Sequence, residues 1–376
     1  MALQLFVPTF EIEECLAEIR ECLEKGWTGL GYKTVEFEEA WKKYTGLNHA
    51  YFLNSATAGL NLAVNILMEE NNWSEGDEII TTPNTFVSTN HAIIRHGLKA
   101  VFADIDDTMC LSPESVEERI TEKTRAIMYV AIGGNIGNYY QIVEICKRNQ
   151  LKLILDAAHL AGTRVNGIIP GKEADVVVYS FQAVKNLPTA DSGMICFQNG
   201  EYDDIVRKKG WLGINKDTYT RSVNIGNYKW KYDVDYIGDK WHGNSIMAAI
   251  AIVQLKYLDR DNAYRRQIAS WYRARLENYL NKIKLVRIPE GCESSYHLFQ
   301  VLVENRDEAL MQLNQAGIAP GVHYIDNTQY KMYRYAENSC PYAAYVSEHV
   351  LSLPMHMKLT YDDVNYICDE LIRIVG

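Results

Sequence analysis

Short apolar runs alternate with helical segments between residues 50 and 197, and this alternation constrains the fold more than any other feature of the chain. We predict strands at residues 50–53, 77–82, 100–105, 125–132 and 151–155, with helices at 85–95, 113–120 and 140–148. Strands that alternate with helices of about ten residues are typical of a mostly parallel sheet covered by helices on both faces. The sequence therefore predicts an α/β fold, in which ligands bind beyond the carboxyl ends of the strands.

The rest of the chain follows a looser pattern. Two helices precede the alternating region, at residues 11–25 and 35–44, whereas residues 210–239 are rich in Tyr, Trp, Lys and Asn and indicate a long irregular excursion. Beyond it we predict a strand at residues 295–303 and helices at 245–259, 263–280, 306–316 and 359–375. A chain of 376 residues is long enough for two domains. We place a large domain at residues 1–250 and a smaller α+β domain at residues 251–376.

Charge and cysteine usage exclude several classes of function. The net charge of −10 argues against nucleic acid or an anionic membrane as a partner. No run approaches the ~20 apolar residues of a membrane span, and the first residues lack the basic and apolar regions of a signal peptide. The eight cysteines form no CxxC pair, which favours reduced thiols in the cytoplasm and gives no support for a metal site.

Lys185 is the single lysine in a polar loop between two β-branched runs, residues 176–179 and 194–197. Burial between two strands disfavours the charged form of a lysine. The resulting neutral amine is a nucleophile that forms Schiff bases with carbonyl compounds, pyridoxal phosphate among them. Taken alone, the local sequence favours a solvated loop lysine, so the hypothesis depends on residues elsewhere in the chain.

Two further segments place hydroxyl groups at predicted strand ends. Ser55, Ala56 and Thr57 follow one strand and open a helix, where free backbone N–H groups and the helix dipole favour a phosphate. Simple N-capping by Ser55 explains the same residues equally well. Ser180 closes the strand before Lys185, and its hydroxyl is within reach of the same phosphate.

Carboxylate and aromatic side chains occupy two other strand ends. Asp156 follows the strand at 151–155, and a carboxylate there must be paired or hydrogen-bonded. It would hold the ring nitrogen of a pyridoxal cofactor protonated, although an N-cap fits the local sequence too. His159 is interpreted as a packing or orienting residue. Phe86 follows the strand at 77–82 and could offer its face to a planar ring, although a core aromatic is locally favoured.

The order and spacing of these segments resemble those of the DegT-type (DegT/DnrJ/StrS) sugar aminotransferases. The resemblance extends from about residue 6 to the last helix and rests on Trp27-Thr28-Gly29, Ser55-Ala56-Thr57, Thr85-Phe86, residues 101–106, Asp156-Ala157-Ala158-His159, residues 180–185, residues 238–249, residues 321–324 and residues 351–354. It implies the aspartate-aminotransferase-like fold, known as fold type I, with a mostly parallel seven-stranded sheet in the large cofactor-binding domain. It also implies a homodimer with shared active sites and pyridoxal 5'-phosphate (PLP) bound as a Schiff base to Lys185.

The same resemblance implies a role for each site residue. Asp156 and Lys185 would be catalytic, and the cofactor would be bound by Ser55, Ala56, Thr57, Phe86, Asp156, His159, Ser180, Lys185 and Lys240. Lys240 stands where the family has an Asn that reaches the partner subunit's phosphate. The substrate would be bound by His323, Tyr324 and cations for a diphosphate, for which Lys229, Lys33, Arg221 and Lys231 are the candidates.

The implied reaction moves an amino group from glutamate to a keto group of a nucleotide-linked deoxysugar. The alternatives are an aminotransferase for a cyclitol or other small polyol ketone, a PLP-dependent sugar dehydratase, and a ligand sensor without turnover. The related dehydratases carry His in place of the lysine, so Lys185 argues against that reading. Gln182, where the family often has His, and Ala190-Asp191-Ser192, where it has Gly-Glu-Gly, put the substrate rather than the cofactor in doubt.

Overall fold

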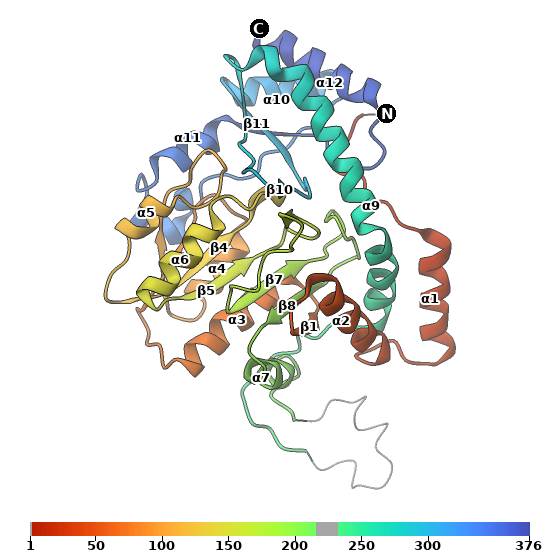
Figure 1. Cartoon of the computed structure of the whole chain (residues 1–376), viewed down its shortest axis with the longest axis vertical. Helices are drawn as coiled ribbons and strands as arrows, with labels where there is room; N and C mark the ends of the chain where they lie inside the picture. Colours follow the sequence, from red (N-terminus) through yellow and green to blue (C-terminus); the bar gives the residue numbers. More distant parts are fainter. Residues whose placement is uncertain (1, 216–231) are drawn as a thin grey trace.

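A seven-stranded sheet forms the centre of the larger part of the molecule (Figure 1). The computed structural model describes residues 2–215 and 232–376. Among these residues the strand order is β1-β8-β7-β5-β4-β2-β3, and β8 runs antiparallel to both of its neighbours, whereas the other neighbouring pairs are parallel. The strands are β1 (His49–Leu53), β2 (Glu78–Thr81), β3 (Lys99–Phe102), β4 (Thr124–Val130), β5 (Lys152–Asp156), β7 (Val176–Ser180) and β8 (Gly193–Phe197). The predicted mostly parallel sheet is confirmed.

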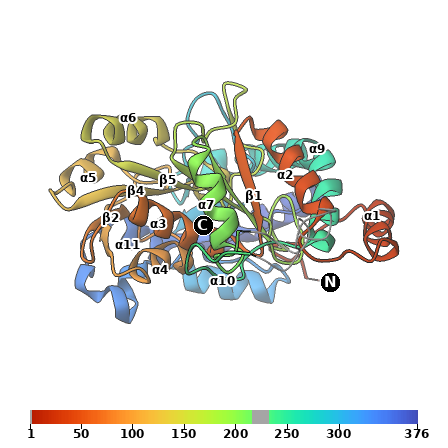
Figure 2. The same ribbon diagram turned by 90° about the horizontal axis from the view of Figure 1, so that it is seen from below.

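Helices cover both faces of this sheet, as predicted. Figure 2 shows α5 and α6 on one face and α3 and α4 on the other. Their bounds are α3 (Ala56–Glu70), α4 (Val87–Ile94), α5 (Pro113–Glu118) and α6 (Tyr139–Asn149). Helices α1 (Ile12–Glu24), α2 (Tyr32–Thr45) and α7 (Glu201–Lys209) complete this part of the chain, with the short β6 (Arg164–Val165) paired to β10 (Cys292–Glu293).

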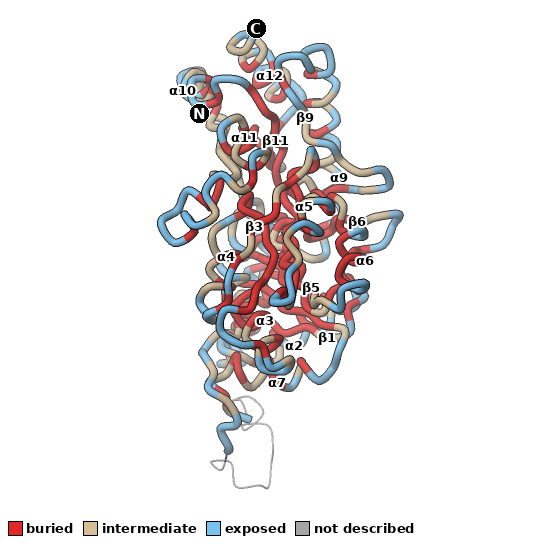
Figure 3. The backbone as a smooth tube through the Cα atoms, turned by 90° about the vertical axis from the view of Figure 1, so that its left-hand side faces the viewer, coloured by how far each residue is buried: buried red, intermediate tan, exposed pale blue. Residues whose placement is uncertain are grey.

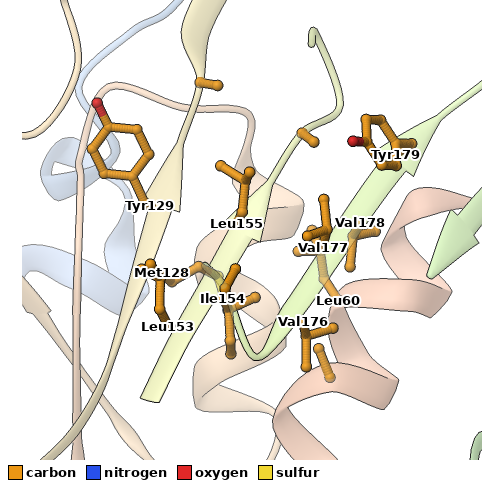
Figure 4. Close-up of a cluster of buried hydrophobic side chains, with 14 of the residues drawn as sticks. Leu60, Met128, Tyr129, Leu153, Ile154, Leu155, Val176, Val177, Val178 and Tyr179 are labelled. Carbon is orange, nitrogen blue, oxygen red and sulfur yellow. The ribbon is translucent and has the colours of Figure 1, made fainter. Parts of the chain in front are cut away.

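The buried residues run along the central strands (Figure 3). Every residue of β7 is buried, and in Figure 4 its valines lie beside the apolar side chains of β4 and β5, with Leu60 of α3 against them. Burying one such aliphatic side chain stabilises the fold by about 1.5–3 kcal/mol. This close packing holds the ends of the strands in fixed relative positions. Polar residues at the strand ends are therefore held in place by the core.

The C-terminal part contains a smaller, antiparallel sheet of order β12-β11-β9. Its strands are β9 (Ile283–Leu285), β11 (Phe299–Val303) and β12 (Val350–Leu353), and they pack with α10 (Arg306–Gln315), α11 (Pro341–His349) and α12 (Tyr361–Val375). Short 3₁₀ turns lie at Ile132–Gly134, Glu277–Tyr279, Asn327–Gln329 and Lys331–Ala336. Residues from this part form a separate hydrophobic cluster. The predicted domain boundary at residues 250 and 251 falls inside a helix, α9, and stays a prediction.

The prediction of two helices at residues 245–259 and 263–280 is wrong, because a single 32-residue helix, α9 (Ser245–Leu276), spans both (Figure 1). The polar stretch at residues 259–262 interrupts the apolar periodicity, and it was therefore interpreted as a break. In the structure Asp261 and Asn262 are buried within the helix. Asn262 is hydrogen-bonded to Asn186 and Ala161 on other segments, and Asp261 pairs with Arg260 of the same helix, so neither polar residue marks a helix end.

The excursion predicted at residues 210–239 lies partly outside the described residues. Its two ends run side by side, joined by isolated β-bridges between Trp211 and Lys240 and between Ile214 and Val234. Within the described ranges, 2–215 and 232–376, no helix is both long and apolar enough to span a bilayer.

Candidate active site

A cavity of about 450 Å³ opens at the carboxyl ends of the parallel strands. Its lining brings together the predicted residues Ser55, Ala56, Thr57, Phe86, Asp156, His159, Ser180, Lys185, His323 and Tyr324. Residues from the ends of β1, β4, β5 and β7 meet there, as expected of a parallel sheet. Residues 323 and 324 come from the C-terminal part of the chain, so the cavity is built from segments far apart in sequence.

Asp156 is the last residue of β5 and is 4% exposed. Thr89 Oγ1 donates a hydrogen bond to its Oδ2 at 2.8 Å, and the backbone N–H of Ala158 donates to Oδ1 at 3.1 Å. Burial raises the pKa of Asp156, and the two hydrogen bonds and Lys185 act in the opposite direction. Both carboxylate oxygens are therefore held in place at the floor of the cavity. Thr89 has no signal in the sequence, because it is an ordinary polar residue of α4.

Lys185 lies in the loop that joins β7 and β8, and it lines the same cavity as Asp156. Its backbone N–H donates to the carbonyl of Gln182 at 2.8 Å, which tightens the loop. Burial lowers the pKa of Lys185 to about 8, and the charge of Asp156 partly offsets this effect. About a tenth of the side chain is then a neutral, nucleophilic amine at pH 7, far more than for a lysine of ordinary pKa. The loop lysine that the local sequence alone favours as solvated is thus half-buried.

The N-terminus of α3 forms one wall of the cavity. Ser55 is its N-cap and accepts a hydrogen bond from the N–H of Ala58 at 3.1 Å, so the N-capping interpretation is confirmed. Gly193 of β8 approaches this turn closely: a Cβ at residue 193 would lie 2.6 Å from Ala56 N. Helix N-termini attract anions. Ser180, which is buried at the end of β7, presents its hydroxyl to the same cavity.

His159 and Tyr324 form a hydrogen-bonded pair, and the neighbours of His159 determine which of the two is the donor. The backbone N–H of Gly133 donates to His159 Nδ1 at 3.1 Å, so this nitrogen carries no proton. Burial lowers the pKa of His159 well below its usual range, which keeps the ring neutral with its proton on Nε2. Nε2 lies 3.3 Å from the Tyr324 hydroxyl and donates to it. The hydrogen of that hydroxyl can then be donated to a group in the cavity.

The mouth of the cavity is more open than its floor. The Phe86 side chain is 57% exposed, and Gln182 and Asp191 are exposed at the same rim. His323 is half-buried, with Nδ1 3.0 Å from Ser352 Oγ. Burial and the charge of Lys185 lower its pKa to about 4. The mouth therefore offers neutral polar groups, an aromatic face and one carboxylate.

The model of one protein family, the DegT/DnrJ/EryC1/StrS aminotransferase family, matches residues 10–372. The chain belongs to this family. The spore coat polysaccharide biosynthesis protein SpsC of Bacillus subtilis is 31% identical, over 96% of this chain and 95% of that protein. The PLP form of the putative sugar aminotransferase Spr1654 of Streptococcus pneumoniae is 26% identical with a TM-score of 0.90 (100% and 99% covered). PseC of Helicobacter pylori, an aminotransferase involved in pseudoaminic acid biosynthesis, is 25% identical with a TM-score of 0.91 (100% and 99% covered).

Membership in the DegT/DnrJ/EryC1/StrS family makes this protein a PLP-dependent aminotransferase of fold type I. The chemistry of the cavity fits that cofactor. It offers a buried carboxylate for a protonated ring nitrogen, an amine of lowered pKa for an aldehyde, and a helix N-terminus with hydroxyls for a phosphate. These groups all line one cavity, at separate strand ends, as a planar cofactor requires.

Lys33, a predicted substrate cation, lies apart from the cavity in this chain. Its ammonium is buried and lies 2.5 Å from Glu18, 3.0 Å from Glu21 and 3.0 Å from Glu36. These hydrogen-bonded carboxylates raise its pKa against the effect of burial, and the residue does not line the cavity. A diphosphate would have to displace three carboxylates from it. Lys33 links α1 and α2 by these ion pairs, and its contact with a substrate stays a prediction.

Of the other predicted cations, Lys240 alone lies among the described residues, and it does not line the cavity. Lys240 is exposed, and its Nζ lies 5.6 Å from the Trp211 ring. Lys229, Arg221 and Lys231 lie outside the described residues. Sequence reasoning also passed over Thr89 and two buried residues behind the lysine loop, Asn186 and His297. No local pattern marks them, because their polar partners come from distant segments.

Proposed function

We propose that the chain transfers an amino group from glutamate to a keto group of a nucleotide-linked deoxysugar. The observation that carries the proposal is the pair Asp156 and Lys185 facing one cavity of a size suited to a cofactor and a small substrate. Its relatives support the sugar substrate, because SpsC is a polysaccharide biosynthesis protein and Spr1654 is a putative sugar aminotransferase. We place the reaction in the cytoplasm, since the eight cysteines are all unpaired.

In this proposal the floor residues hold the cofactor. Lys185 would hold its aldehyde group, Asp156 would pair with the ring nitrogen, and Phe86 would lie against the ring. Ser55, Ala56, Thr57 and Ser180 bind the phosphate, and Lys240 reaches it from the partner subunit of a homodimer. When bound, PLP supplies an electron-withdrawing ring that stabilises negative charge at the substrate carbon. Lys185 Nζ, with its lowered pKa, takes a proton from that carbon and returns it.

The residues at the mouth would bind the sugar. Tyr324 donates its hydroxyl hydrogen to a substrate oxygen, because its own oxygen accepts from His159 Nε2–H and leaves the hydrogen free. His323 stays neutral and offers a second polar contact. A diphosphate needs cations in addition. Lys229 remains the proposed ligand for it, together with Arg221 and Lys231.

A second candidate, an aminotransferase for a cyclitol or other small polyol ketone, is favoured by one observation. Among the described residues that line the cavity, Lys185 is the only lysine or arginine. An uncharged polyol needs hydroxyl, amide and carboxylate partners of the kind that Gln182, Asp191 and Tyr324 provide. The dehydratase alternative is disfavoured by the presence of Lys185, and a sensor without turnover has no use for an amine of lowered pKa.

An optical assay of the purified holoenzyme tests the proposal and separates the candidates. Glutamate should bleach the visible absorbance of the bound cofactor, and an accepted ketone should restore it. The acceptors are GDP-, dTDP- and UDP-linked ketosugars and, in parallel, a cyclitol ketone without a nucleotide. Restoration by a nucleotide-linked sugar at the lowest concentration supports the first candidate, and restoration by the cyclitol supports the second. Absorbance that no amino donor changes would exclude both and favour the sensor.

A further inference from the structure

Asn186, the residue after Lys185, sits at the centre of a buried polar chain. Its side-chain Nδ2 donates to Asn262 Oδ1 at 2.7 Å and to the carbonyl of Ser295 at 2.7 Å. Its Oδ1 lies 3.1 Å from His297 Nδ1. The four residues are 0–7% exposed, so water cannot replace these partners.

Two backbone carbonyls fix the direction of every hydrogen bond in this chain. The carbonyl of Ala161 can only accept, so the group of Asn262 that faces it at 2.9 Å is the amide NH₂. The carbonyl of Ser295 orients Asn186 in the same way. The oxygen of Asn186 then faces His297, and His297 must carry its proton on Nδ1.

His297 links this chain to the aromatic wall of the cavity. Its ring stacks on Phe6 with centroids 5.3 Å apart, and its centroid lies 4.3 Å from that of His159. Burial lowers the pKa of His297 well below its usual range, so the ring is neutral and donates a single proton to Asn186. A neutral ring beside Lys185 also adds no positive charge that would oppose protonation of the amine.

The buried polar chain around Asn186 joins the two loops that carry residues of the proposed reaction. Ala161 belongs to the loop that follows Asp156 at the end of β5 and that also carries His159, whereas Asn186 belongs to the loop after β7. Asn262 of α9 bridges them, at the position where the sequence predicted a helix break. Gly162 allows the close approach, since a Cβ there would lie 2.2 Å from Asn262 Nδ2 and its φ is +85°.

We propose that Asn186, Asn262 and His297 are positioning residues that set Lys185 relative to Asp156 through this chain of oriented hydrogen bonds. This inference rests on the proposed role of Lys185 in the reaction. The amide of Asn186 is one residue from the lysine, and it is hydrogen-bonded to α9 through Asn262 and to the segment before β11 through Ser295 and His297. A shift of the loop by about 1 Å is enough to lower a rate by as much as ~10²-fold.

Two substitutions of His297 separate positioning from packing. His297→Asn places an amide nitrogen where Nδ1 stands and keeps the donor to Asn186, but it loses the ring stack. His297→Phe keeps the ring and loses the donor. We expect kcat to fall by roughly 10- to 100-fold in the Phe variant, with KM for both substrates little changed, and to fall by only about threefold in the Asn variant. We expect the opposite ranking in Tm, because the Phe variant retains the stacked ring.

A readout on the apoprotein makes the test independent of turnover. The rate at which an acylating reagent modifies Lys185, followed by mass spectrometry as a function of pH, reports the environment of its amine. His297→Phe should shift the midpoint of this profile, and His297→Asn should leave it near that of the parent protein. If the Phe variant does not fold, Asn262→Asp, which keeps the acceptor for Asn186 and loses the donor to Ala161, takes its place and should lower kcat with little effect on KM.

Equal kcat and equal acylation profiles in the two His297 variants would overturn the proposal, and so would a Phe variant as active as the parent. Failure of the proposed function has a different signature. In that case Lys185→Ala would retain turnover, whatever the His297 variants do. Loss of turnover in Lys185→Ala together with identical His297 variants would leave Lys185 as catalytic and assign the hydrogen-bonded chain to stability alone.

Discussion

The floor and the mouth of the cavity differ in how firmly the fold holds them. At the floor, Asp156 and His159 are less than a tenth exposed, and each has hydrogen-bond partners on other elements. At the mouth, Phe86 is 57% exposed, and Asp191 and Gln182 lie at the surface. Burial shifts the pKa values of the floor groups and requires that each be paired. The fold therefore constrains the residues proposed to hold the cofactor more strongly than those proposed to bind the substrate.

The same difference fits relatives at 25–31% identity, such as SpsC and PseC, which belong to the biosynthesis of different sugars. Changing a floor residue leaves a buried polar partner without its hydrogen bond, which costs about 1–3 kcal/mol. Changing an exposed mouth residue costs little stability. Substitutions of the two regions should thus have effects of very different size, and the following experiments test whether they do.

The largest effect is expected from Lys185→Ala. Removing the amine removes the group that exchanges a proton with the substrate carbon, and general acid–base catalysis contributes about 10²–10⁴-fold. Because the same amine would also hold the cofactor, we expect a loss of at least ~10⁴-fold in kcat. Single-turnover bleaching of the cofactor absorbance by glutamate measures it. A variant within tenfold of the parent enzyme would show that the floor does not perform the reaction.

Lowering the pH should slow the capture of cofactor by the apoenzyme. The pKa of Lys185 is lowered to about 8, and the neutral amine is the reactive form. Below that pH the neutral fraction, and with it the association rate of PLP, should fall about tenfold per pH unit. Stopped-flow absorbance between pH 6 and pH 9 measures the profile. A rate that still rises steeply above pH 9 would mean that the amine has the pKa of a solvated lysine. The floor would then be no more buried than the mouth.

Thr89→Val should lower activity without removing any group that would contact the cofactor. The substitution removes the hydroxyl that donates to Asp156 at 2.8 Å. A hydrogen bond to a charged group contributes about 1.5–3 kcal/mol, so we expect a loss of roughly 10- to 100-fold in kcat/KM. Thr89→Ser keeps the hydroxyl and is the matched control, expected within about threefold of the parent. Equal losses in both variants would assign the effect to packing around the methyl group.

The floor could be predicted from the sequence because its main residues end strands. Asp156 and Ser180 close apolar runs, and Lys185 follows a few residues later, so the rule for parallel sheets locates them without knowledge of their contacts. Partners on other elements could not be found in this way. Thr89 faces Asp156 from α4, and nothing in its local sequence distinguishes it from a surface threonine.

The wrong helix break and the ion pairs of Lys33 teach the same lesson. The polar residues near position 260 predict the end of a helix, yet α9 continues, because Asn262 is hydrogen-bonded to Ala161 and Asn186. The sequence likewise gives no sign of the three glutamates around the Lys33 ammonium. In both cases the sequence shows a polar side chain but not its partner. Local periodicity does not predict which distant segments pair with one another.

The smallest effect is expected at the mouth. Gln182 is exposed, and its Oε1 accepts from the backbone N–H of Val184, so Gln182→Ala leaves no buried group unpaired. We expect KM for the keto substrate to rise by about three- to tenfold, as for the loss of one neutral hydrogen bond of about 0.5–1.5 kcal/mol. Bleaching of the cofactor by glutamate alone should be unchanged. A fall in the glutamate half-reaction of Gln182→Ala would mean that the mouth takes part in the cofactor chemistry and is not confined to substrate choice.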